Sequence, residues 1–215
     1  MILYGSSMSP YVRKVLACAA EKGITLESRP TGFRDENPEF RAASPFGKMP
    51  ALVDGDYNLA DSSAIIHYLE AKHPEPALIP AEPRARGRTI WWDEFGDTLL
   101  MGCLQKLFFN RVVAPILLKR EGDPEVADAA EKRELPPLLS YLEGQVPEGG
   151  FLVGDRLTLA DVAVASPLAN LEHMGMTVDG GRYPRLAAYV ERILARPSFV
   201  ERLTKERAFM QKVAA

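Results

Sequence analysis

The chain has 215 residues, 47% of them hydrophobic, and its 26 basic and 29 acidic residues give a formal net charge of −3. This length and composition suit a soluble protein of one large or two small domains with a sizeable core. The basic residues are dispersed and form no run, so neither nucleic acid nor an anionic membrane surface is expected as a partner.

The first residues, MILYGSS, lack a basic region followed by an apolar stretch, so we expect a cytoplasmic rather than a secreted protein. The most apolar window, LLMGCLQKLFFNRVVAPILL, contains Lys106 and Arg111, which the core of a bilayer would penalise. This window therefore predicts a buried helix rather than a membrane span.

The cysteines and histidines give no pattern typical of a metal site. Cys18 and Cys103 lie far apart, each within a helical pattern, where a buried apolar thiol is the expected role. The three histidines, His67, His73 and His173, share no metal-ligand spacing with each other or with the cysteines. We expect no metal.

The first elements alternate between strand and helix. Ile2-Leu3-Tyr4 predicts a short buried strand, and residues 5–9 predict a turn. From Pro10, apolar residues recur at helical spacing as far as Gly23, which sits where a helix C-terminal cap belongs. Residues 25–29 predict a second strand, and EFRAAS, after an Asn-Pro pair, predicts a short helix.

The next segment, MPALVDGDYNLADSSAIIHYLEAKHP, predicts a hairpin followed by a helix. Residues 51–53 and 57–59 flank a turn that contains Gly55. Asp61 or Ser62 then caps a helix that ends at His73-Pro74. The order βαβα followed by ββα predicts an α/β domain of thioredoxin type.

Everything after this domain has a helical pattern. The Pro-rich stretch HPEPALIPAEP predicts a linker, so we expect an α/β domain over residues 1–75, a linker over 76–84 and an all-helical domain over 85–215. The first long helix runs from Arg84 to about Lys119, and Pro115 should kink or end it. Later helices are expected from Asp123, with a disturbance at Pro136-Pro137, from a capping box at Thr158-x-x-Asp161, over 183–195, and from Pro197 onward.

The polar cluster Ser6, Ser7 and Ser9 leads through Pro10 into the first helix, and this start has two interpretations. A serine followed by proline at the first helical position is an ordinary N-cap. A helix N-terminus with a hydroxyl at its tip also favours a bound anion. The stretch alone leaves both open.

Ser9-Pro10-Tyr11-Val12 occupies the turn at which a thioredoxin or glutaredoxin carries Cys-Pro-Tyr-Cys. Serine performs no disulfide exchange, but the anion-favouring geometry of a helix N-terminus remains. A thiolate brought by another molecule is then the natural ligand.

Four motifs, in order, are SPYVRKV, PFGKMPALVDG, LADSSAIIHYL and FLVGDRLTLADVAVA. With them nearly the whole chain resembles the soluble glutathione transferases. The resemblance implies an N-terminal thioredoxin-like domain that binds glutathione and an all-helical domain that supplies the pocket for a second substrate. Thr158 and Asp161 match a folding motif of that helical domain, so we leave them out of the site.

The resemblance also implies roles for individual residues. Ser9 matches the serine that hydrogen-bonds the sulfur of glutathione in serine-type classes, where it is a donor and not a nucleophile. Met49, before a cis Pro50, would turn its backbone N–H and C=O towards the cysteinyl residue. Lys48 takes the place of the basic or polar side chain that often holds the glycyl end.

Asp61 and Ser62 match the pair that holds the γ-glutamyl end of glutathione. The carboxylate of Asp61 can accept from an ammonium, while the Ser62 hydroxyl and the N–H groups of its helix can bind a carboxylate.

Other residues on the first turn compete for these roles. Ser6 and Ser7 share the turn with Ser9, and Tyr4 lies near the position of the catalytic tyrosine in other classes. Tyr4 also falls inside an apolar strand, where it would pack in the core. Arg13, one turn into the helix, either adds positive potential near the sulfur or is solvated.

The second substrate is not identified by the sequence. Its pocket is expected between the domains. The candidate lining residues are Tyr11, Phe33, Trp92, Phe95 and Phe108. An aromatic residue at helical spacing equally suits a core position.

The resemblance implies a glutathione S-transferase that attacks an electrophilic small molecule with the glutathione thiolate, as in detoxification. Glutathione would be a co-substrate, and the protein a homodimer. Isomerisation, dehalogenation and ether cleavage also occur within the family. The alternative is a glutathione-binding or protein-interaction module of the same fold with little transferase activity.

Overall fold

The computed structural model describes residues 1–32 and 35–214 and divides into two compact units, Met1–Ile79 and Pro80–Ala215. The first is a thioredoxin-like α/β unit and the second is all-helical, as the sequence predicts. The division after Ile79 falls inside the segment 76–84 expected to be a linker. Phe33, one of the candidate pocket residues, lies outside the described residues.

The first unit is built on a four-stranded sheet in the order β2-β1-β3-β4. β1 runs parallel to β2 and antiparallel to β3, and β4 pairs with β3 in a hairpin. The strands are β1 Ile2–Tyr4, β2 Glu27–Arg29, β3 Ala51–Asp54 and β4 Tyr57–Ala60. Strand β2 is shorter than expected by two residues.

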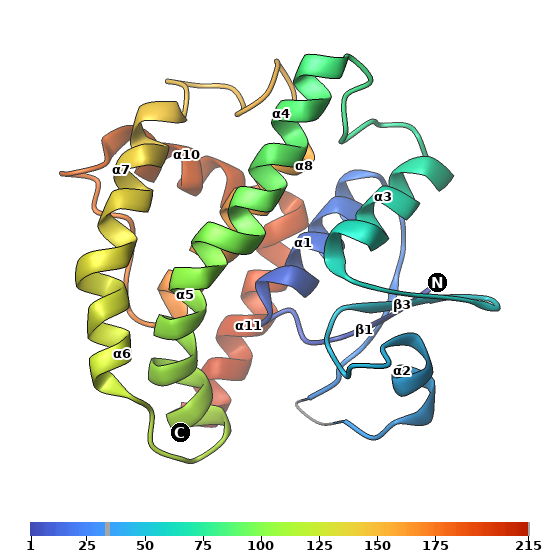
Figure 1. The fold of residues 1–215 in the computed structure, drawn as a ribbon, viewed down its shortest axis with the longest axis horizontal. Coiled ribbons are helices and arrows are strands. Elements are labelled where there is room, and N and C mark those ends of the chain that lie inside the picture. The colour runs from blue at the N-terminus through green and yellow to red at the C-terminus, as the bar shows by residue number, and fades with distance from the viewer. Residues whose placement is uncertain (33–34, 215) are drawn as a thin grey trace. The chain divides into compact units, whose positions relative to one another are not determined.

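Three helices cover the sheet, and Figure 1 shows α1 and α3 on one face and α2 on the other. They are α1 Pro10–Glu21, α2 Pro38–Ala43 and α3 Ser62–Lys72. α1 begins with Pro10 and is followed by Gly23 at φ +68°, a left-handed conformation that glycine adopts without cost. Asn37 and Asp61 cap α2 and α3 by accepting from backbone N–H groups. The predicted elements of this unit are confirmed.

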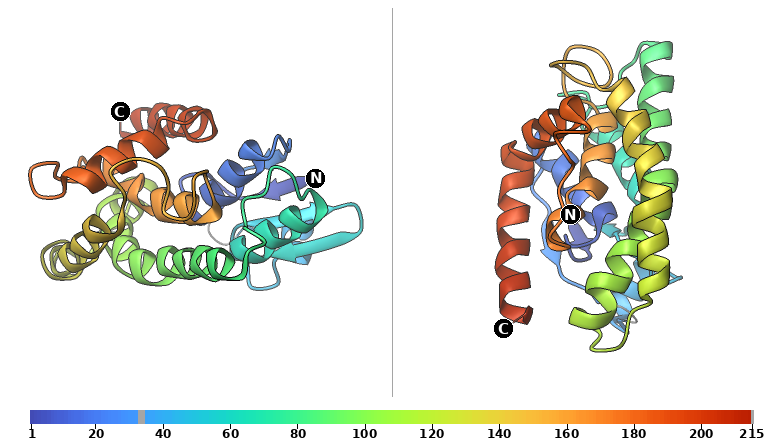
Figure 2. Two further views of the ribbon diagram at one scale, coloured as in Figure 1. Left: turned by 90° about the horizontal axis from the view of Figure 1, so that it is seen from above. Right: turned by 90° about the vertical axis from the view of Figure 1, so that its left-hand side faces the viewer.

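The second unit begins with one long helical run over Pro83–Leu117. A second run lies beside it, as Figure 2 shows. The first run comprises α4 Pro83–Glu94, η1 Phe95–Leu100, α5 Met101–Phe108 and η2 Phe109–Leu117, and the second α6 Pro124–Ala129, η3 Ala130–Glu134 and α7 Leu135–Gln145. The remaining helices are α8 Leu159–Leu168, α9 Asn170–His173, α10 Pro184–Leu194 and α11 Pro197–Ala214.

Both long runs contain π-helical turns (η1, η2 and η3) that the sequence pattern did not predict. Pro115 lies within η2, two residues before the run ends at Leu117, so the helix does end near this proline. A proline lacks the N–H that an α-helical turn requires, and a widened turn tolerates that loss.

The predicted capping box at the start of α8 is confirmed. Asp161 is fully buried and accepts hydrogen bonds from the backbone N–H of Thr158 and of Leu152. The Tyr189 hydroxyl donates to it at 2.7 Å. Burial raises the pKa of Asp161, and these donors oppose that rise. Asp161 therefore joins three segments of the helical unit.

The run Pro83–Leu117 is long and apolar enough to cross a bilayer by length and composition, but half of its most apolar window is buried inside the structure. Its two central cations pair with the second run: Lys106 with Glu134 at 2.8 Å, and Arg111 with Glu131 at 2.5 Å. These features are those of a helix packed within a helical unit.

A buried ion pair fixes the end of the first unit. The ammonium of Lys22, directly after α1, lies 2.7 Å from the Glu70 carboxylate and also donates to the Pro76 carbonyl. The Lys22 side chain is 1% exposed. Glu70 in turn accepts from the backbone N–H groups of Leu78 and Ile79. One carboxylate therefore ties α1, α3 and the segment after α3 together.

We predict that Glu70→Ala lowers the free energy of unfolding by about 3–5 kcal/mol, because it leaves the Lys22 charge buried without its partner. Urea unfolding monitored by circular dichroism measures the change. Glu148→Ala, at an exposed glutamate, is the control and should shift stability by less than about 0.5 kcal/mol. Equal effects of the two substitutions would contradict the structural role of the pair.

Candidate functional site

The register of the sheet brings three predicted site segments to one end. Tyr4 on β1 pairs with Ala51 on β3, and Ala51 pairs with Ala60 on β4. The turn that carries the serines follows Tyr4, Met49-Pro50 precedes Ala51, and Asp61-Ser62 follows Ala60. The three segments therefore lie at the same end of the strands, although 40 or more residues separate the first segment from the second.

Gly5 is the position where two of these segments meet. Its φ is +142°, and a side-chain Cβ placed on it would lie 2.5 Å from a methyl group of Val12 and 3.3 Å from the Cβ of Met49. Only glycine combines this backbone conformation with so close an approach. The start of α1 and the Met49 segment therefore lie together across Gly5.

Ser9 is the N-cap residue of α1, with extended backbone angles and a partly buried side chain. Its hydroxyl makes no capping hydrogen bond, although its backbone N–H donates to the Ser6 carbonyl at 2.9 Å. A capping serine normally accepts from the N–H of the second or third helical residue. The hydroxyl at this helix N-terminus is therefore left for another partner.

The competing hydroxyls are placed differently. The Ser6 hydroxyl accepts from the Met8 backbone N–H at 3.4 Å. The Tyr4 hydroxyl donates to the Glu39 carboxylate at 2.6 Å and accepts from the Arg29 guanidinium at 3.0 Å. Tyr4 is 2% exposed, and burial together with its bond to Glu39 raises the pKa of its phenol. Tyr4 therefore has the expected core position.

The Met49-Pro50 peptide bond is cis, as expected. The residue before it, Lys48, is exposed, and the Ser44 hydroxyl accepts from its N–H at 2.9 Å and donates to its C=O at 2.6 Å. These two bonds close the loop from α2 to β3. The Lys48 backbone is therefore fixed while its side chain is in solvent.

Asp61 has a φ of +83°, one of two non-glycine residues with positive φ among those described. Its Oδ1 accepts from the N–H groups of Ser63 and Ala64 at 2.9 and 3.0 Å, and its side chain makes no other hydrogen bond to a described residue. Such a backbone conformation costs free energy and is often found at functional sites. The second oxygen, Oδ2, keeps its acceptor capacity.

The hydrogen bonds of Asp61 change one expectation from the sequence. The N–H groups at the start of this helix were expected to be available to a carboxylate ligand, but those of Ser63 and Ala64 already bind the Asp61 side chain. Ser62 is 2% exposed. The ammonium of Lys14 on α1 donates to the Ser63 hydroxyl at 3.1 Å and so connects α1 with the start of α3.

Most of the aromatic residues considered for the second pocket are buried. Trp92 and Phe95 are 2% and 4% exposed and pack against each other with ring centroids 5.3 Å apart. Phe108 is 9% exposed and lies 6.3 Å from the His173 ring, while Tyr11, on α1, is partly buried. Trp92 and Phe95 therefore have the core positions that their helical spacing equally suited.

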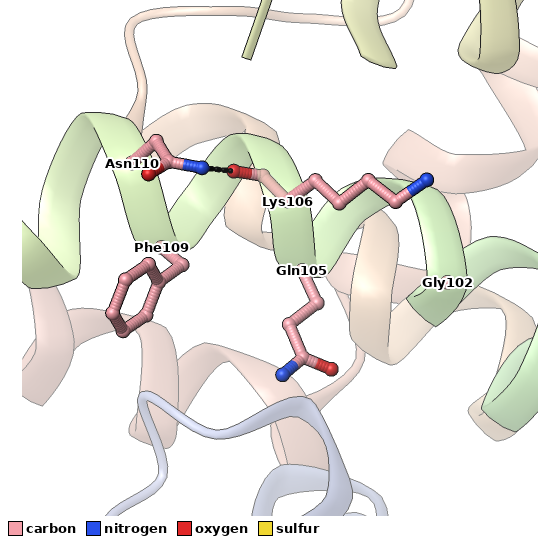
Figure 3. A pocket seen from close by; sticks show the side chains of 5 residues that line it. All are labelled: Gly102, Gln105, Lys106, Phe109 and Asn110. Carbon is pink, nitrogen blue, oxygen red and sulfur yellow. Dashed lines mark hydrogen bonds between the residues drawn. The ribbon is translucent and has the colours of Figure 1, made fainter. Parts of the chain in front are cut away.

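A hollow on the surface of the helical unit was missed by sequence reasoning. The residues that line it are Gly102, Gln105, Lys106, Phe109 and Asn110, on one side of α5 and the start of η2 (Figure 3). The sequence could have indicated this hollow, because residues spaced three and four apart lie on one face of a helix. The ring of Phe109 and the amide of Gln105 point the same way.

In the described part of the chain, no group of three His, Cys, Asp or Glu residues is arranged to hold a metal ion. Cys18 and Cys103 are both buried thiols, and burial raises the pKa of Cys103 to about 11. The Cys103 thiol is therefore protonated and unreactive at neutral pH.

Comparisons with known proteins cover both units. A family model described as the glutathione S-transferase N-terminal domain matches residues 3–77, and one described as the C-terminal domain matches residues 104–197. The chain is 32% identical to a glutathione S-transferase of Hyoscyamus muticus over 206 residues, 93% of this chain and 95% of the relative.

Two further matches are informative. A stringent starvation protein A homolog of Coxiella burnetii is 28% identical over 213 residues, 99% of this chain and 96% of that protein. The solved structure of a glutathione S-transferase I bound with lactoylglutathione has a TM-score of 0.83 at 27% identity and covers 94% of this chain and 98% of that one.

We predict that Ser9→Ala changes the free energy of unfolding by less than about 0.5 kcal/mol, because no capping bond is lost. Asn37→Ala is the matched comparison, since the Asn37 side chain accepts from the N–H groups of Glu39 and Phe40. Its loss should cost about 0.5–2 kcal/mol. Chemical denaturation of both variants measures the difference, and a larger loss for Ser9→Ala would make Ser9 a structural cap.

Proposed function

Because the chain belongs to the glutathione S-transferase family, we propose that it activates the thiol of glutathione through Ser9 and joins the sulfur to an electrophilic small molecule. The observation that carries this proposal is the Ser9 hydroxyl, which stands at the N-terminus of α1 without a capping bond. A detoxifying role and a cytoplasmic location belong to the same proposal, as does the absence of a metal cofactor.

A hydrogen bond from Ser9 and the dipole of its helix can together ionise the thiol. A free thiol with a pKa of about 8.5 is only a few per cent ionised at neutral pH. A hydrogen bond to a charged group contributes about 1.5–3 kcal/mol, which lowers the pKa by roughly one to two units. The helix dipole adds about 0.3–1 kcal/mol. Together they make the thiolate the main species.

The rest of the tripeptide would be held by the two other segments at the same end of the sheet. The backbone of Met49 binds the cysteinyl residue, and the Oδ2 of Asp61 accepts from the γ-glutamyl ammonium. Ser62 donates to the neighbouring carboxylate. Lys48 offers an ammonium to the glycyl end. The support is the shared register of these segments and the strained backbone of Asp61.

The hollow on α5 and η2 is proposed as a site for the second substrate. Phe109 offers an aromatic face and Gln105 offers an amide donor and acceptor. Trp92 and Phe95 contribute by shaping the core behind this helix rather than by contact, because they are buried. Phe108 is buried as well and contributes in the same way, whereas Tyr11 and Phe33 remain candidates for contact.

A second candidate function is a glutathione-binding or interaction module with little transferase activity. A relative that matches 99% of this chain is named a stringent starvation protein A homolog, which is the observation that favours it. Retention on immobilised glutathione is compared with turnover of a generic chlorinated aromatic substrate. Retention without turnover supports the module, and turnover supports the enzyme.

A homodimer is also proposed, and exposed aromatic side chains support it. Phe46, between Pro45 and Gly47, is 89% exposed, the largest exposed fraction of a large apolar side chain among the described residues. Tyr57 at the hairpin is 45% exposed and Trp91 on α4 is 39% exposed. Two-fold dimers are the commonest oligomers, and each of these residues would occur twice in such an interface.

We predict that Ser9→Ala raises the thiol pKa of bound glutathione by roughly one to two units and leaves its affinity nearly unchanged. The rate should fall roughly 10- to 150-fold if the donor acts fully on the transition state. Thiolate absorbance of bound glutathione, titrated against pH, measures the pKa. Ser6→Ala, Ser7→Ala and Tyr4→Phe are the controls and should do much less. A shift in one of these, with none in Ser9→Ala, would assign the catalytic hydroxyl elsewhere.

We predict that the chain forms a dimer at micromolar concentration and that Phe46→Ser raises its dissociation constant by about tenfold or more, since burying a phenylalanine contributes about 1.5–3 kcal/mol. Light scattering over a dilution series measures both. Phe209→Ser, at another exposed phenylalanine, is the matched control. A wild-type chain that scatters only as a 23.7 kDa monomer contradicts the proposal.

A further inference from the structure

An arginine lies beside the aromatic wall of the hollow on α5 and η2. Arg120 follows η2 in the loop that leads to α6, and its guanidinium carbon lies over the Phe109 ring, 5.3 Å from the ring centre. Phe109 is one of the residues that line the hollow. The backbone N–H of Arg120 donates to the Ala114 carbonyl of η2 at 3.0 Å, so this part of the loop folds back onto the helix. The guanidinium is therefore held next to the hollow.

The rest of this loop is tied to a second residue of the hollow. The Asp123 N–H donates to the side-chain oxygen of Asn110 at 2.9 Å, and the Asn110 amide nitrogen donates to the Lys106 carbonyl at 2.8 Å. Gly122 lies so close to the Asn110 carbonyl that a Cβ would overlap its oxygen. The loop is therefore anchored at Arg120 and again at Gly122 and Asp123.

Arg120 brings a positive charge that no neighbouring carboxylate neutralises directly. Lys106, the cation among the lining residues, already pairs with Glu134 at 2.8 Å. Arg120 is exposed and makes no ion pair with any residue that the structure describes. Its neighbours Lys119 and Glu121 are also exposed and carry opposite charges, which cancel. The five N–H donors of the guanidinium are therefore available to a ligand.

The hollow suits a planar aromatic ligand that carries a negative group. Its volume of about 380 Å³ is that of a site for a small molecule. The half-buried Phe109 ring can stack with an aromatic ligand, and the Gln105 amide beside it can donate and accept hydrogen bonds. A guanidinium binds a carboxylate through two parallel hydrogen bonds. The step from such a ligand to a substrate rests on the proposed function, which places the second substrate in this hollow.

We propose that the second substrate is an aromatic electrophile that carries a carboxylate, and that Arg120 binds this carboxylate while Phe109 stacks on the ring. The glutathione sulfur forms a bond to the ring carbon that holds the leaving group, and a halide leaves with the electron pair of its former bond. The carboxylate takes no part in this exchange. Arg120 therefore selects the substrate without acting on the reacting atoms, and its loss raises KM without lowering kcat.

The test compares 4-chloro-3,5-dinitrobenzoate with its methyl ester, which lacks the charge. Each enzymatic rate is divided by the uncatalysed rate with glutathione, because the ester group activates the ring more strongly. Arg120→Gln should raise KM for the acid about three- to fivefold and leave its kcat and both constants of the ester unchanged, since an exposed ionic contact is lost. Arg120→Lys keeps the charge and should retain most of the preference. Arg156→Gln, at an exposed arginine elsewhere in the helical unit, is the matched control and should change neither compound.

A binding measurement separates this inference from the proposed function. Calorimetric titration with 3,5-dinitrobenzoate, which has no leaving group, reports on the hollow whether or not the protein is a transferase. The wild type should bind it, and both Arg120→Gln and Phe109→Leu should weaken the complex about three- to fivefold. No binding, or an equal effect of Arg120→Gln on the acid and the ester, overturns the inference while the transferase proposal stands. Binding without turnover of either chlorinated compound overturns the transferase proposal and keeps the anion site.

Discussion

The close approach at Gly5 is the constraint on which the proposed site depends. Strand β1 turns there into the serine loop, and Val12 of α1 and Met49 both lie close to the position that a Cβ would occupy. Any side chain at this position would push the start of α1 away from the Met49 segment. The helix N-terminus and the segment before β3 form one surface because this position holds no Cβ.

The phenol of Tyr4, at the end of the same strand, connects the sheet with α2. Its bonds to Glu39 and Arg29 fix α2 against the sheet, and Phe40 of α2 packs 5.9 Å from the Tyr4 ring. α2 then leads into the loop closed by Ser44 around Lys48. A tyrosine so engaged, with a raised pKa, is a poor donor to a thiolate, which is consistent with the role proposed for Ser9.

Short-range patterns predicted most of the fold. The alternation of strand and helix, the hairpin around Gly55 and the capping box at Thr158 and Asp161 each follow from residues close in sequence, and the structure has all of them. The π-helical turns were not predictable. An apolar repeat determines which face of a helix is buried, but not whether an N–H bonds to the carbonyl four or five residues before it. The burial of Trp92 and Phe95 was left open for the same reason, since spacing cannot distinguish a core from a pocket.

The candidate site was predictable only in part. The resemblance supplied Ser9, Lys48, Met49-Pro50 and Asp61-Ser62, and the register then explained why these distant segments meet. The sequence predicted a cap on α3 by Asp61 or Ser62, and Asp61 forms it with the N–H groups of Ser63 and Ala64. The position of the Arg41 guanidinium beside Gly47 was not predicted, because it depends on how the loop after α2 folds.

Burial decides what each ion pair of the first unit can do. Lys22 and Glu70 are buried, so the loss of one partner leaves the other charge without solvation. The pair therefore stays formed in the folded protein. Arg41 and Glu36 have the same chemistry at the surface, where water replaces a lost partner at little cost. A pair of the first kind stabilises the fold and cannot respond to a ligand. A pair of the second kind adds little to the stability of the fold, because breaking it leaves both charges in water.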